Sequence, residues 1–195
     1  MELIEVIKNR RSTRKFKEDI VEREKLELLI DAARLAPSAK NRQPWYFVIL
    51  ENEIKNKVAN IMGNQLASQQ DICGRVDEPT NPHNPASSVK ASIKIIKEAP
   101  ALILVFRNPD SNWKEGDYLS IGCAVEHLCL RVTDLGLGSL WIRDVVYAIS
   151  EIGSFISKCD MELVTAVSIG YSNEFPYERR KKDITEIMEW YCEDK

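Results

Sequence analysis

The chain lacks the features that several classes of function need. Its 195 residues carry a net charge of −3, from 27 basic and 30 acidic side chains, so no overall positive field draws it to nucleic acid or to an anionic membrane. No apolar run approaches the ~18 residues of a membrane span. The first residues, 1–5, lack the basic segment and long apolar stretch of a secretory signal. We therefore expect a cytoplasmic protein with no nucleic-acid and no membrane partner.

Cysteine and glycine are sparse, and their spacing matches no metal-binding, redox or dinucleotide-binding motif. The five cysteines are odd in number and form no CxxC pair, which is typical of reduced thiols. Cys123 and Cys129 are six residues apart in a predicted helix and would lie on different faces, so we expect no metal site. The chain has no GxGxxG fingerprint, so a nicotinamide cofactor would not be held by a Rossmann unit.

The length of the chain suits one domain, residues 1–195, and apolar spacing predicts that helices outnumber strands in it. Helical spacing occurs at 3–7, 26–33, 54–66, 89–98, 117–135 and 149–156. Compact apolar runs of strand length occur at 45–50, 101–106 and 162–169. Helices separate each predicted strand from the next, which indicates an α+β sandwich around a small central sheet.

Two segments differ from this pattern. Residues 69–88 are polar and hold Pro79, Pro82 and Pro85, so we expect a loop or lid there with no regular element. Residues 117–135 form the strongest predicted helix, apolar on most of its surface. A helix that is apolar nearly all round is buried, either by its own chain or by a partner.

The first chemical motif is Arg10-Arg11-Ser12-Thr13-Arg14. In extended chain, Arg10, Ser12 and Arg14 share one face, and Arg11 and Thr13 face away. Arg10 and Arg14 would then lie roughly 13 Å apart, too far to bind one phosphate together. This spacing suits an elongated ligand, with its phosphate near Arg10 and Ser12 and another acceptor near Arg14. The alternative interpretation is a solvated basic turn.

The second motif is the stretch Ala-Pro-Ser-Ala-Lys-Asn-Arg-Gln-Pro-Trp at residues 36–45. Ser38 and Ala39 are small enough for the backbone to approach an aromatic ring. Asn41 and Gln43 can each donate and accept hydrogen bonds, as ribityl hydroxyls or a uracil-like edge require. Alone, this motif could simply be a loop that ends a helix. Together the two motifs predict a flat, phosphate-bearing cofactor, for which flavin mononucleotide (FMN) is the natural candidate.

The two motifs, in this order and followed by an aromatic-led strand, resemble the nitroreductase family of FMN-dependent oxidoreductases. The similar segments are residues 10–16, 36–45, Ala99-Pro100 before an apolar strand, 134–142 and, more weakly, the basic tail after Gly170-Tyr171. The resemblance covers nearly the whole chain apart from a variable lid or loop at about 62–90.

The resemblance implies a three-layer α-β-α sandwich with a small, mostly antiparallel sheet and a long buried central helix. It also implies an obligate homodimer with two FMN sites, each built from both subunits. Arg10 and Ser12 would hold the phosphate, and Arg14 would lie nearer the pyrimidine edge. We include Arg11 in the candidate set, although alternation turns it outward. The tail, about 171–195, would pack on the partner subunit.

The remaining candidate residues come from three other segments. The partner subunit would supply Pro37, Ser38, Ala39, Asn41 and Gln43. Ile142 and Arg143 would lie along the ring, where the family places a backbone N–H against the flavin N5. Arg179 and Lys181 would complete the phosphate site, with Arg180 as the alternative if the register shifts by one; a solvated tail is the other interpretation.

The implied activity places the chemistry on FMN, with no catalytic side chain. NAD(P)H would bind transiently and give hydride to FMN, and a small acceptor such as a nitroaromatic or quinone would follow in a ping-pong mechanism. One alternative is other flavin chemistry on the same fold, either reductive dehalogenation or flavin fragmentation. The other is a non-catalytic module that binds nucleic acid, which the net charge opposes.

Other conspicuous side chains receive structural interpretations. His127, where the family often has asparagine, lies on the apolar helix and is best explained as a core or interface group. Trp45, Phe47 and Trp141 are interpreted as core residues.

Overall fold

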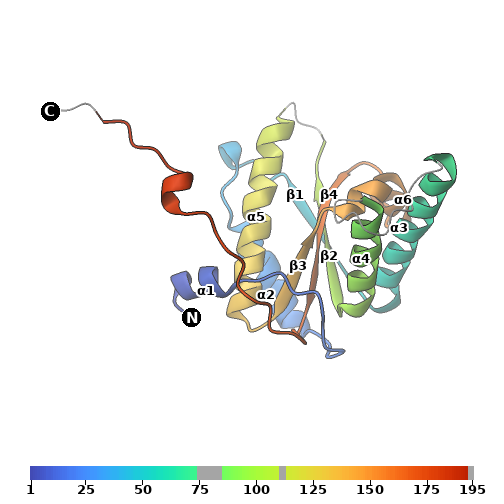
Figure 1. Cartoon of the computed structure of the whole chain (residues 1–195). Helices are drawn as coiled ribbons and strands as arrows, with labels where there is room; N and C mark the ends of the chain where they lie inside the picture. The colour runs from blue at the N-terminus through green and yellow to red at the C-terminus, as the bar shows by residue number, and fades with distance from the viewer. Residues whose placement is uncertain (74–84, 110–112, 193–195) are drawn as a thin grey trace.

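A computed structural model of the protein describes residues 1–73, 85–109 and 113–192 (Figure 1). Its four-stranded sheet has the order β1-β2-β4-β3, and each neighbouring pair is antiparallel. The strands are β1 (Trp45–Glu51), β2 (Ala101–Arg107), β3 (Gly138–Ile142) and β4 (Glu162–Gly170). Strands β1 and β3 therefore form the two edges. This confirms the small antiparallel sheet that the resemblance implied.

Helices cover both faces of the sheet. The α-helices are α1 (Leu3–Asn9), α2 (Arg23–Arg34), α3 (Asn52–Cys73), α4 (Pro85–Glu98), α5 (Lys114–Asp134) and α6 (Ile149–Phe155). Short 3-10 turns are η1 (Ala39–Asn41), η2 (Asp144–Ala148) and η3 (Ile184–Glu186). Helices α2 and α5 lie on one side and α3, α4 and α6 on the other, which confirms the three-layer sandwich (Figure 1).

Strand β2 connects two apolar layers, because all seven of its residues are buried. Leu102, Leu104 and Phe106 belong to the layer under α3 and α4. Ile103 and Val105 alternate with them and belong to the layer under α2 and α5. A strand covered on both faces has no polar side, which is why this segment is continuously apolar in the sequence.

Helix α5 begins three residues before its predicted start and ends one residue before its predicted end. One face is buried against the sheet through Ile121, Ala124, Val125, Leu128 and Val132. The opposite face is open in the single chain, where Leu119 is 75% exposed and Cys123 is also exposed. The long helix is therefore buried by its own chain on one side only.

The prediction that no regular element occurs at 69–88 is wrong at both ends. Helix α3 continues to Cys73, and α4 begins at Pro85. Proline fits the first turn of a helix because the backbone N–H that it lacks has no intrahelical partner there. Met62 and Val89, in the region interpreted as a variable lid, belong to the buried core. Positions 74–84 lie outside the described residues.

Strand β3 was not among the predicted strands, and one of its residues was misassigned. Trp141 is 45% exposed and is not a core residue, whereas Trp45 and Phe47 are partly buried. Trp141 projects from an edge strand, and its indole N–H donates to the Thr165 hydroxyl at 2.8 Å.

Within the described ranges, none of the helices has the length and apolar character to cross a membrane.

Candidate functional site

The first motif is extended, as predicted, and crosses the start of β3. Ser12 forms a parallel bridge with Ser139, and the Thr13 backbone N–H donates to the Ser139 carbonyl at 2.8 Å. Further along, Phe16 bridges Ser172, just after β4. The segment after α1 is therefore attached to the ends of two strands, and this attachment fixes where its side chains lie.

Thr13 turns inward, away from the cationic side chains, as the alternation predicted. Its side chain is buried against Gly138. A Cβ at Gly138 would lie 2.5 Å from the Thr13 Oγ1 atom and 2.9 Å from its Cβ. Glycine at this position therefore allows the motif to lie directly on β3.

A pocket of about 480 Å³ joins the first motif to the C-terminal tail. It is lined by Arg10, Arg11, Ser12, Arg14, Glu174, Phe175, Pro176, Tyr177, Arg179 and Lys181. Five of these residues are cationic and one is acidic, so the pocket favours an anion. Guanidinium groups donate in a planar fork that suits phosphate. The structure thus brings together the phosphate residues predicted at the two ends of the chain.

Two arginines of this pocket form ion pairs with carboxylates in the single chain. Arg10 Nε lies 3.7 Å from the Glu126 carboxylate, and Arg11 Nη2 lies 3.5 Å from that of Glu178. All four side chains are more than a quarter exposed. Ion pairs at such exposure contribute little stability, so these guanidinium groups can exchange their carboxylates for a phosphate at small cost.

The expected outward direction of Arg11 is wrong, because Arg11 lines the same pocket as Arg10. Its guanidinium bends back and donates to the Lys8 and Arg10 carbonyls near the end of α1. This local curl replaces the strict alternation of a strand. In the tail, Arg179 and Lys181 line the pocket, and Arg180 is not among its lining residues. Which of the three binds a phosphate stays a prediction.

The second motif forms an exposed loop between α2 and β1. Its backbone has positive φ at Lys40 (54°), Asn41 (53°) and Gln43 (48°). Such conformations cost about 1–3 kcal/mol each and persist only where the surrounding structure fixes them. Inside the loop, the Gln43 backbone N–H donates to the Ser38 hydroxyl at 3.0 Å. The loop therefore has a defined conformation despite its exposure.

This loop rests on the first half of α5 and not on the first motif. The Ala39 backbone N–H donates to Ser120 Oγ at 3.4 Å, and Arg42 Nε lies 3.4 Å from Asp117 Oδ1. Residues 37–43 contribute nothing to the lining of the cationic pocket. Within one chain, the two predicted halves of the site are therefore separate.

Ile142 and Arg143 lie at the far end of β3 from the first motif. Ile142 is buried, and its carbonyl accepts a hydrogen bond from the Thr165 hydroxyl at 2.8 Å. Arg143 is exposed and lines a smaller pocket of about 250 Å³, together with Trp141. From Ser139 to Ile142, the last residue of β3, the strand extends roughly 10 Å. Edge strand β3 thus connects the cationic pocket to this second hollow, in a length suited to an elongated ligand.

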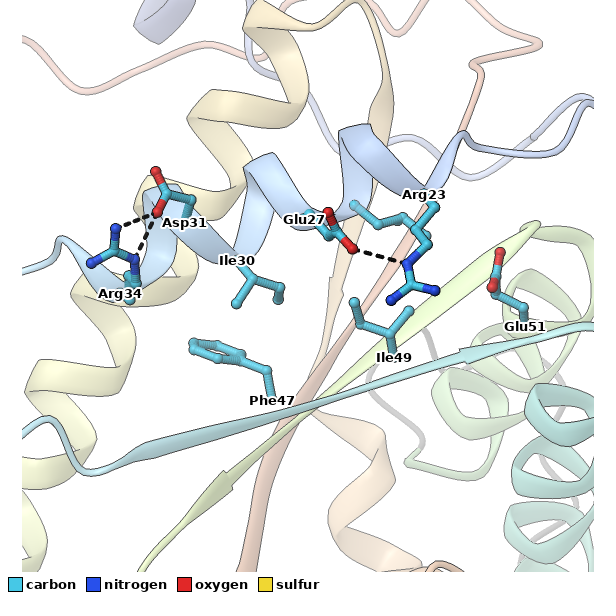
Figure 2. A pocket seen from close by; sticks show the side chains of 9 residues that line it. Arg23, Glu27, Ile30, Asp31, Arg34, Phe47, Ile49 and Glu51 are labelled. Atoms are coloured by element: carbon cyan, nitrogen blue, oxygen red, sulfur yellow. Dashed lines mark hydrogen bonds and ion pairs between the residues drawn. The ribbon is translucent and has the colours of Figure 1, made fainter.

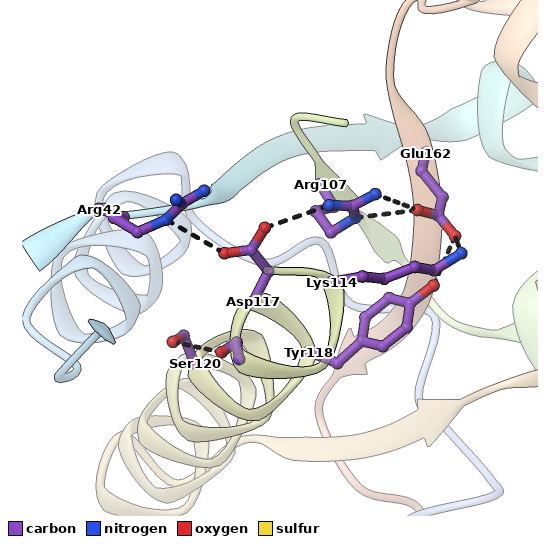
Figure 3. Close-up of polar contacts among 8 residues, drawn as sticks. Arg42, Arg107, Lys114, Asp117, Tyr118, Ser120 and Glu162 are labelled. Carbon is purple, nitrogen blue, oxygen red and sulfur yellow. Dashed lines mark hydrogen bonds and ion pairs between the residues drawn. The ribbon is translucent and has the colours of Figure 1, made fainter. Parts of the chain in front are cut away.

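Sequence reasoning missed a buried polar network at the start of α5 (Figure 3). Arg107 Nη1 donates to Asp117 Oδ2 at 3.1 Å, and Arg107 Nε donates to Glu162 Oε2 at 2.9 Å. The side chains of Arg107 and Asp117 are only 5% and 2% exposed. Burial opposes ionisation of Glu162, but hydrogen bonds from Tyr118, Lys114 and Arg107 outweigh it and lower its pKa. The sequence shows these charges but not that they meet.

A groove between α2 and β1 is a poor candidate for anion binding (Figure 2). Its lining residues are Arg23, Leu26, Glu27, Ile30, Asp31, Arg34, Phe47, Ile49 and Glu51. Its two arginines pair with carboxylates on the same helix, Arg23 with Glu27 and Arg34 with Asp31. Three acidic and two basic residues leave no excess positive charge, and no predicted site residue lines this groove.

Two further reactive side chains among the described residues, Cys129 and His127, offer no competing centre. Burial raises the pKa of Cys129 to about 11, so its thiol is protonated and unreactive at neutral pH. His127 lies in a largely apolar pocket beside Leu3 and Leu130 and is partly buried, in keeping with its interpretation as a core or interface group. Among the described residues, no group of three or more His, Cys, Asp or Glu side chains could hold a metal ion.

The fold is an α+β sandwich with a cationic pocket beside edge strand β3. Residues 7–171 match the model of the nitroreductase family. The chain therefore belongs to the nitroreductase family.

Two curated proteins that are similar to this chain are named for different activities. It is 26% identical over 143 residues to a putative NADH dehydrogenase/NAD(P)H nitroreductase of Methanothermobacter thermautotrophicus, and the match covers 72% of this chain but only 60% of that protein. It is 29% identical over 140 residues to an iodotyrosine deiodinase of Thermotoga neapolitana, covering 71% of this chain and 72% of the relative.

Solved structures with the same fold cover nearly the whole chain. A BluB-like flavoprotein from Clostridium difficile 630 is 26% identical with a TM-score of 0.80, and the match covers 98% of this chain and 100% of that one. The FMN- and NADPH-dependent nitroreductase NfnB from Sphigopyxis sp. strain HMH has a TM-score of 0.83 over 98% and 100% of the two chains. At 16% identity, the second similarity supports the fold alone.

Proposed function

We propose that the protein binds FMN and transfers hydride from NAD(P)H to a small acceptor. The observation that carries this proposal is the pocket in which five cationic side chains, from residues 10–14 and 179–181, meet at the start of edge strand β3. The nitroreductase family match over residues 7–171 supports the same activity. The 26% identical BluB-like flavoprotein and the 26% identical NAD(P)H nitroreductase of Methanothermobacter thermautotrophicus support the choice of cofactors.

The residues of the pocket fit a phosphate-bearing cofactor. Arg10, Ser12, Arg179 and Lys181 would hold the phosphate, and Arg14, which lines the same pocket, would lie nearer the pyrimidine edge. Arg11, also in the lining, adds positive charge. When bound, FMN supplies the capacity to accept hydride from NAD(P)H and to pass it to an acceptor. The chain itself binds and orients the cofactor.

The ring would extend from the cationic pocket along β3 toward Ile142 and Arg143. Edge strands present backbone N–H and C=O groups that a planar polar ligand can bind. Trp141 and Arg143 line the smaller hollow at this end of the strand. That hollow is where we place NAD(P)H and the acceptor in turn, which is the ping-pong order.

We further propose that the site is completed in a homodimer. Pro37, Ser38, Ala39, Asn41 and Gln43 do not line the cationic pocket of their own chain, so they would serve the FMN of the partner subunit. The exposed face of α5, including Leu119, would be covered by the second copy.

The tail, residues 171–195, would pack on that second copy. Beyond the residues that line the cationic pocket, the part of the tail that carries η3 leads away from the body of the molecule (Figure 1). Trp190 and Tyr191 are among its highly exposed apolar residues, and their burial would supply a strong apolar contact. This arrangement accounts for an aromatic segment that its own chain leaves uncovered.

Reductive dehalogenation is the second candidate activity, because the 29% identical relative is an iodotyrosine deiodinase. Nitroaromatics and quinones are the acceptors that we favour. An anaerobic assay with a nitroaromatic, a quinone and iodotyrosine, each added to enzyme reduced by NADH or NADPH, distinguishes these activities by which compound reoxidises the enzyme.

The absorption spectrum of the purified protein tests the proposed cofactor. A yellow protein with flavin absorption that is bleached by NADH or NADPH is the expected result. A colourless protein whose melting temperature does not rise on addition of FMN contradicts the proposal, because a specific ligand stabilises the native state that binds it.

A further inference from the structure

The loop Ser38–Gln43 has a conformation that two of its residues, Lys40 and Gln43, do not favour. Lys40, Asn41 and Gln43 have φ values of 54°, 53° and 48°, and none of them is glycine. The left-handed region places Cβ close to the backbone carbonyl, so residues other than glycine and asparagine rarely occupy it. Contacts outside the loop must therefore help to hold it.

Those contacts come from one face of α5 and the residue before it. The Lys40 Nζ atom lies 4.8 Å from the centroid of the Trp113 ring. Arg42 Nε lies 3.4 Å from Asp117 Oδ1. Three residues further along, Ser120 Oγ accepts the Ala39 backbone N–H. Positions separated by three and four residues share a helix face, so this face forms a continuous support under the loop.

Asp117 is the fixed point of this support. Its side chain is buried, and the equally buried Arg107 guanidinium donates to its other carboxylate oxygen. Arg107 is held in turn by Glu162 at the start of β4 (Figure 3). The Asp117 carboxylate is thus anchored to two strands of the sheet. Arg42, whose side chain is 30% exposed, extends from the loop to this anchored charge.

We propose that Asp117 and Arg42 are positioning residues that keep the loop in its binding conformation before the cofactor arrives. This inference rests on the proposed function, in which the loop contacts the FMN of the partner subunit. A protein that is competent in only a fraction of its molecules binds with an affinity reduced by that fraction. Loss of the ion pair lowers the competent fraction, so it slows association of FMN and leaves dissociation unchanged.

The test uses Arg42→Gln, which removes the loop's side of the pair and leaves Asp117 hydrogen-bonded to Arg107. Arg34→Gln is the matched control, because Arg34 is an exposed arginine that pairs with Asp31 at the end of α2. Arg42→Lys keeps the positive charge, so its association rate with FMN is expected to lie between those of Arg42→Gln and wild type. Each full-length apoprotein is mixed with FMN, and flavin fluorescence is followed by stopped flow.

For Arg42→Gln, we expect the association rate constant to fall about tenfold, as for a loss of nine-tenths of the competent population. The dissociation rate constant stays within about twofold of wild type. Arg34→Gln matches wild type in both. In the apoprotein, trypsin cleaves after Lys40 faster in Arg42→Gln than in wild type, and saturating FMN removes this difference.

Two results overturn the proposal. One is an unchanged association rate together with unchanged cleavage after Lys40. The other is an increase in the dissociation rate alone, which identifies Arg42 as a direct flavin contact. A wild-type apoprotein that binds no FMN contradicts the proposed function instead, and cleavage after Lys40 still tests whether Arg42 holds the loop. If Arg42→Gln does not fold, Arg42→Lys is compared with wild type instead, and the same two results overturn the proposal.

Discussion

The backbone N–H of Thr13 donates a hydrogen bond to the carbonyl of Ser139, with 2.8 Å between the two heavy atoms. This bond joins the first motif to edge strand β3, and the cationic side chains on either side of Thr13 line the candidate phosphate pocket. The pocket therefore depends on how closely the motif can approach the strand, and Gly138 sets that distance.

Replacing Gly138 with alanine should push the motif away from β3. The added methyl would lie 2.5 Å from Thr13 Oγ1 and 2.9 Å from Thr13 Cβ, so more than the end of a side chain must move. We expect Gly138→Ala to lower the free energy of unfolding by about 1–3 kcal/mol, as for other overpacked sites. Urea denaturation of the apoprotein measures this change.

Gly116→Ala is the control for this substitution. A Cβ at Gly116 would meet no atom within 4 Å, and the residue lies in helix α5. Alanine there should raise stability by up to about 1 kcal/mol through helix propensity. Equal unfolding midpoints for the two alanine variants would show that Thr13 is not closely packed on Gly138.

Arg179→Ala and Lys181→Ala should weaken FMN binding more than Arg180→Ala. Arg179 and Lys181 line the cationic pocket, and Arg180 is absent from its lining. Loss of one hydrogen bond to a charged group costs about 1.5–3 kcal/mol, or roughly tenfold to a hundredfold in Kd. Equilibrium titration of the apoprotein with FMN measures the three constants. If Arg180→Ala has the largest effect, the register of the tail is shifted by one residue.

Glu22 should contribute to the loss of stability in acid. A backbone hydrogen bond, the Tyr171 hydroxyl and the Lys25 ammonium lower the pKa of Glu22 from 4.5 to about 2. Because the pKa is lower in the folded protein, this stabilisation is complete above about pH 4.5 and is lost as pH falls toward 2. Glu22→Gln should therefore flatten the dependence of unfolding free energy on pH in that interval.

Urea unfolding between pH 7 and pH 3 provides the measurement for Glu22→Gln. Glu24→Gln, on the same exposed turn, controls for the loss of one negative charge. An identical pH profile for wild type and Glu22→Gln would mean that the Tyr171 contact does not persist in solution.

Leu119→Arg should prevent dimerisation. Leu119 is 75% exposed in the single chain and lies on the open face of α5, where we place the second copy. A buried arginine without a partner would oppose association. Sedimentation velocity should show a monomer with native circular dichroism and weakened FMN binding. Ile54→Arg, on α3 across the sheet, is the control and should remain dimeric; a dimeric Leu119→Arg would place the interface elsewhere.

Local sequence predicted much of the fold because most elements here have clear periodicity. The continuous apolar run at 101–106 is strand β2, and the spacing of Leu26, Leu29 and Ala33 is the buried face of α2. The extended first motif was also predicted, since its serine and threonine and the following Phe16 disfavour helix. In each case, the pattern is completed within a few residues.

The errors arose where a local signal is compatible with two structures or where distant contacts decide the structure. Pro85 suggested a loop but begins α4, because proline is compatible with a first helical turn. Strand β3 is five residues long and is defined by pairing with β4, which follows it by some twenty residues. Trp141 was interpreted as a core residue, yet it is exposed on edge strand β3. None of these outcomes is encoded in the neighbouring residues alone.

For the candidate site, too, local residue types predicted part of the arrangement, and contacts between distant residues decided the rest. The residue types of the two motifs predicted an anionic, planar ligand, but not that Arg11 would bend back into the pocket. The network of Arg107, Asp117 and Glu162 was missed because its members lie on three separate elements. Only the folded chain brings them together.

The pairing of β2 with β4 also has a consequence for biosynthesis. Ala101 lies opposite Ile169, so the central strand lacks one neighbour until β4, the last strand, has left the ribosome. Contacts between residues so far apart in sequence form slowly, because a long segment of chain must first be ordered. From the synthesis of β2 until that of β4, the edge of β2 that will pair with β4 presents unpaired backbone N–H and C=O groups. Chaperone binding to nascent chains that end before residue 162 is the expected result.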